Sequence, residues 1–145
     1  MPSILDRVRG MIRGEVPPAP VATLLGFRVV DVEPGRAVFE MEAGPQHANP
    51  MGTLHGGVLC DIADAAMGIA FASTLSEGES FTTLELKINF LKPVWSARLT
   101  ATAKVVKRGK TVGLVECDVV DETASLVARA SSTCLMLAGK SAEGR

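Results

Sequence analysis

The pattern of apolar and polar positions predicts one long central helix between two groups of β-strands. The stretch from 56 to 74 is apolar on almost every side and is interrupted only by Asp61 and Asp64, which is typical of a buried helix. Two strand-like segments precede this helix and four follow it, several with apolar residues at alternate positions. The predicted strands are 27–32, 37–42, 80–91, 98–107, 111–120 and 125–137.

Short turns separate most of these strands, so the strands should pair antiparallel. In the hairpin Arg108-Gly109-Lys110, the glycine is expected to supply a positive φ. One antiparallel sheet that buries one helix gives an α+β architecture. A chain of 145 residues is expected to form a single main domain of this kind.

The two ends of the chain are expected to lie outside that domain. Residues 1–19 should form an amphipathic helix over 3–13, with a proline-rich linker after it. This helix should pack on the body or on a partner, and a helix lying on a membrane surface is the alternative. The main domain is expected over 20–139, beginning with a helical turn that ends at Gly26. The tail 140–145 is expected to be disordered.

Composition excludes several classes of protein. Hydrophobic residues make up 47% and charged residues 21% of the chain, which excludes disorder and suggests that another subunit covers apolar surface. A net charge of −1 argues against nucleic acid as a partner. Since no apolar stretch reaches the length of about 20 residues that a bilayer requires, we expect no membrane partner.

The cysteines and the N-terminus point to the cytoplasm. Cys60, Cys117 and Cys134 have neither a disulfide-like nor a zinc-like spacing, so we expect buried, inert thiols in a reducing compartment. Charged residues interrupt the first 13 positions, which a secretory signal would not allow. No metal-binding spacing and no nucleotide-binding glycine loop is present, so we expect neither a metal nor another cofactor.

The start of the central helix is the first candidate for chemistry. His55-Gly56-Gly57 opens a helix whose first N–H groups have no partner within the helix. Glycine allows close approach of a substrate, and free N–H groups at the positive end of the helix dipole suit a developing oxyanion. The alternative is a tight turn that requires glycine for steric reasons alone.

Three polar residues near this start are further candidates. Asp64 is surrounded by apolar residues, so it acts as base or nucleophile in a pocket or is paired across a subunit interface. Asp61 lies nearer the helix start, where the dipole favours a carboxylate. Asn49, in the preceding loop, either holds a carbonyl or a water or stabilises a turn. A triad of Cys60, His55 and Asp64 fails because the helix turns Cys60 away from His55.

Together these residues resemble a known family. Asn49-Pro-Met-Gly-Thr-Leu-His55-Gly56-Gly57, with Asp64 seven positions later, resembles the signature of hotdog-fold acyl-CoA thioesterases of the phenylacetate-pathway (PaaI-like) type. The resemblance implies a hotdog fold, an antiparallel sheet wrapped around the central helix. It also implies homodimers that assemble into tetramers, with active sites at the dimer interface.

The resemblance also implies roles for individual residues. Gly56 would offer its N–H to the thioester carbonyl, and Asp64 of the other chain would act as base or nucleophile. Asn49 would orient carbonyl or water. The hydroxyl of Thr83 would position the water or the carboxylate, and a shift of the register by one residue would give this role to Thr82. The tip of the hairpin would contact the CoA phosphates, although a solvated tip is the alternative. The candidate substrate-binding residues are His55, Gly57, Asp61, Arg108, Gly109 and Lys110.

We therefore expect an enzyme that hydrolyses a small or medium acyl- or aryl-acyl-CoA to free acid and CoA. A hotdog hydratase or dehydratase and a non-catalytic acyl-CoA-binding protein are the alternatives. Helix geometry separates Gly56 from Asp64 by about 12 Å along one axis, so one carbonyl cannot contact both within a chain. A second chain is required. The acyl group and a carrier-protein thioester as substrate both remain open.

Overall fold

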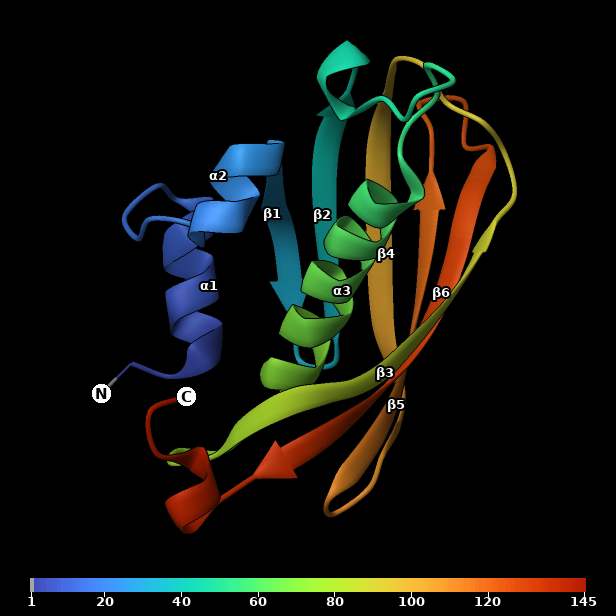
Figure 1. Cartoon of the computed structure of the whole chain (residues 1–145). Helices are drawn as coiled ribbons and strands as arrows, with labels where there is room; N and C mark the ends of the chain where they lie inside the picture. Colours follow the sequence, from blue (N-terminus) through green and yellow to red (C-terminus); the bar gives the residue numbers. More distant parts are fainter. Residues whose placement is uncertain (1) are drawn as a thin grey trace.

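The computed structural model describes residues 2–145, in which six strands form one sheet around a central helix (Figure 1). The helices are α1 (Ile4–Ile12), α2 (Pro20–Leu25) and α3 (Gly56–Ala72), with short 3-10 helices η1 (Pro45–His47) and η2 (Gly139–Ala142). The strands are β1 (Phe27–Glu33), β2 (Arg36–Ala43), β3 (Ser80–Phe90), β4 (Ala97–Arg108), β5 (Val112–Val120) and β6 (Leu126–Leu137). The predicted strands and α-helices are confirmed with bounds that differ by at most two residues.

The sheet has the order β1-β2-β4-β5-β6-β3, and every neighbouring pair is antiparallel. A short loop joins β3 to β4, yet β3 pairs with β6, so the prediction that short connections join paired strands is wrong here. The loop crosses the end of the sheet because its backbone forms hydrogen bonds with residues outside β3 and β4. Leu91 N–H donates to the Val127 carbonyl at 2.9 Å, and the Val94 carbonyl accepts from Leu54 N–H at 2.7 Å.

The sheet curves around α3, as the hotdog architecture requires (Figure 1). One face of α3 is closely packed, and Ile62, Met67 and Phe71 are fully buried in the core. The prediction that α3 is buried on all sides is wrong for the isolated chain, because Gly57, Asp61 and Asp64 are exposed. These positions are three or four residues apart and form one stripe along the helix.

The N-terminal helices cover the β1 edge of the sheet (Figure 1). Ser3 and Asp6 form a capping box at the start of α1, whose apolar side packs against β1 and α3 and buries Val8. Helix α2 ends at Gly26 with φ 86°, the left-handed stop that the sequence predicts. Within 2–145, no helix is both long and apolar enough to cross a membrane.

Two further details differ from expectation. Gly109 does not have the positive φ expected of it; glycine is needed because a Cβ there would lie 2.6 Å from the Val112 carbonyl oxygen. The expected disordered tail begins directly after Gly139, and η2 gives part of it regular structure. The expected N-terminal segment starts at residue 1, which lies outside the described residues.

Candidate active site

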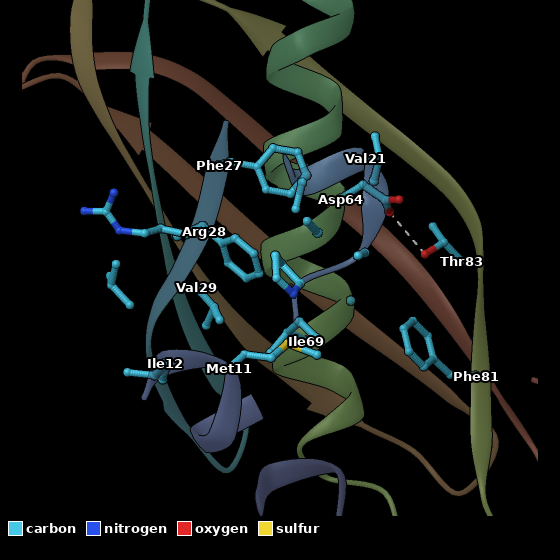
Figure 2. A pocket seen from close by; sticks show the side chains of 17 residues that line it. Met11, Ile12, Val21, Phe27, Arg28, Val29, Asp64, Ile69, Phe81 and Thr83 are labelled. Carbon is cyan, nitrogen blue, oxygen red and sulfur yellow. Dashed lines mark hydrogen bonds between the residues drawn. The ribbon is translucent and has the colours of Figure 1, made fainter. Parts of the chain in front are cut away.

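Asp64 and Thr83 form a carboxylate–hydroxyl pair between α3 and β3. The Thr83 hydroxyl donates to an Asp64 carboxylate oxygen at 3.2 Å (Figure 2). A β-bulge at Leu84, immediately after Thr83, shifts the register of β3 against β6. Bulges commonly re-aim a neighbouring side chain. The structure thereby selects Thr83 over Thr82 as the hydroxyl beside Asp64.

The pair lies on an apolar cavity of about 530 Å³. Such a volume is within the range of roughly 300–1,000 Å³ that small-molecule sites occupy. Asp64 also faces a shallower cavity of about 260 Å³, together with Cys60, Asp61 and Glu85. The carboxylate therefore stands between a large apolar space and the exposed surface of the isolated chain.

Gly56 opens α3 as its first residue, and its N–H has no acceptor among residues 2–145. It lines a third cavity, of about 430 Å³, together with Asn49 and Phe90. The ring of Phe90 covers the glycine so closely that a Cβ at position 56 would lie 2.8 Å from its Cζ. Gly56 and Asp64 thus line different cavities within one chain.

Asn49 organises the loop before α3. Its Oδ1 accepts from the N–H groups of Met51 at 2.9 Å and Thr53 at 3.2 Å, and its Nδ2 donates to the Thr53 hydroxyl at 2.8 Å. These bonds correspond to the turn-stabilising alternative. Because Asn49 lines the same cavity as Gly56, this side chain still borders the space where a carbonyl would be held.

Both histidines have structural hydrogen bonds. The Nδ1 atom of His55 accepts from Gly57 N–H at 2.9 Å, so His55 is the N-cap of α3 and the Gly57 N–H is engaged. His47 is buried; its Nδ1 accepts from Gly44 N–H at 3.2 Å and its Nε2 lies 2.7 Å from the Leu25 carbonyl oxygen. The capping role of His55 was not predicted, because histidine is an unusual N-cap.

The hairpin 108–110 lies at the opposite end of α3 from Gly56 (Figure 1). The Arg108 Nε donates to the Thr74 hydroxyl at 3.0 Å, and its guanidinium carbon lies 4.8 Å from the centre of the Phe71 ring. Arg108 is half-buried, whereas Lys110 is exposed. The cation–π contact on Phe71 was not predicted, because the two residues are distant in the sequence.

Asp61 lies beyond the first turn of α3, where the helix dipole has little effect, so the prediction of dipole stabilisation is wrong. The side chain is exposed and borders the shallow cavity beside Asp64.

The three cysteines are free thiols, but only Cys117 and Cys134 are buried as predicted, and Cys60 is half-exposed. Burial raises the pKa of all three and that of Cys117 to about 12, and nearby carboxylates raise the pKa of Cys60 further. Thiols with such values remain protonated and weakly nucleophilic. Residues 2–145 contain no cluster of three or more His, Cys, Asp or Glu side chains that could hold a metal ion.

The N-terminal helix also reaches the site. Met11 and Ile12 of α1 line the large cavity together with Asp64, Ile69 and Phe81 (Figure 2). No sequence pattern assigns α1 a part in the site, since an apolar stripe has the same spacing whether it faces a core or a cavity.

Comparisons with known proteins show the family to which this chain belongs. The family model described as Thioesterase superfamily matches residues 51–128. A 1,4-dihydroxy-2-naphthoyl-CoA hydrolase of Listeria monocytogenes is 34% identical over 71% of this chain and 84% of its own length. Acyl-coenzyme A thioesterase 13 of Homo sapiens is 27% identical over 92% of this chain and 96% of its own.

A solved structure is also similar. The Escherichia coli PaaI protein, from the phenylacetic acid degradation operon, has a TM-score of 0.82 and 27% identity, with 94% of each chain covered. The matched segment 51–128 carries the start of α3, Asp64 and Thr83. This chain therefore belongs to the thioesterase superfamily and has a PaaI-like hotdog fold.

Proposed function

We propose that this chain hydrolyses an acyl-CoA thioester to a carboxylic acid and free CoA. The observation that carries the proposal is the Asp64–Thr83 pair, which lies where a large apolar cavity meets the exposed surface. The names of the relatives support hydrolysis of a CoA thioester rather than hydration or binding without catalysis.

The chemistry requires few groups. With Asp64 as a general base, the carboxylate takes a proton from water while the water oxygen attacks the carbonyl carbon. The C–S bond then breaks, and the CoA thiolate takes up the proton. With Asp64 as a nucleophile, a mixed anhydride forms first and water then cleaves it. In both routes the carbonyl oxygen gains negative charge, which the free Gly56 N–H stabilises.

A dimer would bring the two parts together. Gly56 and Asp64 of one chain line separate cavities, so the partner's Asp64 would face the Gly56 N–H across an interface. The outer edge of β3 carries no neighbouring strand, and an unpaired strand edge favours pairing with another chain. Large apolar side chains near this edge are also exposed, namely Leu84, Phe90, Leu91 and Trp95.

The remaining assignments are of the same kind. Asn49 orients the carbonyl from the loop before α3, and His55, Gly57 and Asp61 border the CoA arm. Arg108, Gly109 and Lys110 contact the CoA phosphates, for which the exposed Lys110 is the better placed cation. Two dimers form a tetramer, and the enzyme works in the cytoplasm without metal or cofactor.

The test is thiol release from a panel of acyl-CoA substrates, compared between wild type and Asp64→Asn. This substitution keeps the shape and removes the charge, so we expect hydrolysis to fall at least about 100-fold, or roughly 2.7 kcal/mol of barrier. Glu77→Gln, in the exposed loop after α3, is the matched control and should hydrolyse like wild type. Equal thiol release by Asp64→Asn and wild type would contradict the proposal.

A further inference from the structure

The large cavity has one polar region and is otherwise apolar. Asp64 and Thr83 bond to each other at its rim. Arg28 contributes only its stem, because its guanidinium pairs with Glu40 at 3.1 Å outside the cavity, and Figure 2 shows it directed away. A charged or hydroxylated group deep in this space would lose its water without gaining a partner.

Helix α1 contributes one wall of the cavity through Met11 and Ile12. Ile69, which lies five residues after Asp64 on α3, lines the same cavity as Met11 (Figure 2). Five residues correspond to about 7.5 Å along a helix axis. A chain that enters beside Asp64 and follows α3 therefore meets the Met11 side chain after a few carbon–carbon bonds. Ile12 is partly exposed and closes the same wall from the outside.

A buried glycine on α3 allows close packing against the helix along this path. Gly68 lies one turn after Asp64 and is buried, and a Cβ there would lie 3.2 Å from the Phe81 ring. Since glycine is less favourable than alanine inside a helix, its presence here has a packing reason. The absent side chain allows the Phe81 ring to lie close against α3, and both residues line the cavity between Asp64 and Met11.

We infer that this cavity holds the acyl group, that it selects an uncharged, unsubstituted hydrocarbon chain, and that Met11 of α1 limits the length of that chain. The inference rests on the proposed function and names the substrate class for that site. The thioester would lie beside Asp64 and Thr83, and the terminal methyl group of the acyl chain would face Met11.

Binding of alkyl-CoA thioethers tests the role of the large cavity without requiring hydrolysis. These analogues keep the chain and lack the carbonyl, and butyl-, hexyl-, octyl-, decyl- and dodecyl-CoA form a series whose Kd calorimetry can measure. Met11→Ala should move the tightest binding to a longer chain, and Met11→Phe to a shorter one. Since one methylene in an apolar pocket changes selectivity at least about 10-fold, we expect shifts of roughly that size in the ratio of Kd values.

Opposite shifts in the preferred chain length for the smaller and the larger side chain distinguish a change in cavity length from a loss of protein stability. Arg7→Ala, on the exposed side of the same helix, should keep the wild-type profile. Unchanged profiles in both Met11 variants, shifts in the same direction, or no binding of any thioether by wild type would overturn the inference.

Polarity provides a second arm. Hexyl-CoA and its analogue with a terminal carboxylate have the same chain, and the charged one should bind at least about 100-fold more weakly. Equal binding of the two would overturn the selection for an uncharged chain. Length-dependent thioether binding without thiol release from acyl-CoA would contradict the proposed function and support the inferred role of the cavity. Thiol release whose length profile is insensitive to Met11 would support the function and overturn the inferred role of Met11.

Discussion

Gly56 is the first residue of α3, and its N–H group is free of any acceptor in the described part of the chain. His55 engages the next N–H group along the chain, that of Gly57, at 2.9 Å. Among the residues that the structure describes, the Gly56 N–H remains free at the cavity that Asn49 and Phe90 also line. A backbone donor can be removed only by proline, and proline is well tolerated at the first position of a helix.

We predict that Gly56→Pro lowers kcat for thioester hydrolysis by about 10²–10³, because it removes one oxyanion donor. His55 has φ −64° and ψ 131°, a conformation that a following proline accepts. Gly56→Ala introduces the same Cβ contact with Phe90 and keeps the N–H, so it is the matched control. Steady-state kinetics should show a far larger loss for proline than for alanine; equal losses would assign the effect to Phe90.

Among single residues, sequence reasoning identified candidate residues more readily than it identified their contacts. Asp64 stood out because a carboxylate in an apolar helix is costly, and that signal needs no structure. Thr83 could not be separated from Thr82, because the bulge at Leu84 that sets their orientation depends on pairing with β6. Arg108 was expected either to contact phosphate or to lie in a solvated hairpin tip, because no sequence pattern places Phe71 beneath it.

At the level of elements, the turn between β5 and β6 depends on one buried carboxylate. Asp121 pairs with Lys92 from the loop after β3 and accepts hydrogen bonds from the Thr123 hydroxyl, Thr123 N–H and Ser125 N–H. The Lys92 ammonium, followed by the Thr123 hydroxyl, holds the pKa of Asp121 well below its usual range. This cluster connects the β3–β4 loop to the β5–β6 turn.

We predict that the pair makes stability depend on pH in the acid range. Because the folded pKa of Asp121 lies below the unfolded value of about 3.9, its contribution is complete well above pH 4 and is lost as the pH falls below about 4. Urea midpoints of wild type and Asp121→Asn should differ most at about pH 7, and the difference should narrow steadily as the pH falls from about 4 toward the folded pKa of Asp121. Glu77→Gln should follow wild type throughout; a constant gap for Asp121→Asn would contradict the prediction.

The elements themselves were largely predictable because their patterns are local. The continuous apolar run of α3 and the alternation in β4 and β5 are sufficient to place these elements within two residues. The pairing of β3 with β6 was not predictable from loop length, because backbone bonds from Leu91 and Leu54 decide the path of the loop. The place of α1 at the cavity is likewise a tertiary contact.

For the whole molecule, the separation of Gly56 from Asp64 within one chain predicts that an active site needs two chains. Eight residues of helix hold them about 12 Å apart along the axis. The two residues also line different cavities of the chain. If one active site combines Gly56 from one chain with Asp64 from its partner, defects in the two residues should complement each other.

We predict that mixing the inactive variants Gly56→Pro and Asp64→Asn restores activity after subunit exchange. In a mixed dimer one site carries both defects and the other carries none, so random exchange should give roughly a quarter of wild-type thiol release. Each variant alone, taken through the same exchange, provides the control. If the mixture stays inactive while mass spectrometry detects mixed dimers, both residues act within one chain.

If Met11 limits the chain length as inferred above, one determinant of selectivity lies apart from the proposed catalytic residues along the gene. Met11 precedes the proline-rich linker, whereas Gly56, Asp64 and Thr83 all lie on the sheet and its central helix. Exchange of the first nineteen codons could therefore alter which chains are accepted and leave the hydrolytic groups in place. The proline-rich linker is therefore a suitable junction for such an exchange, both in natural recombination and in protein engineering.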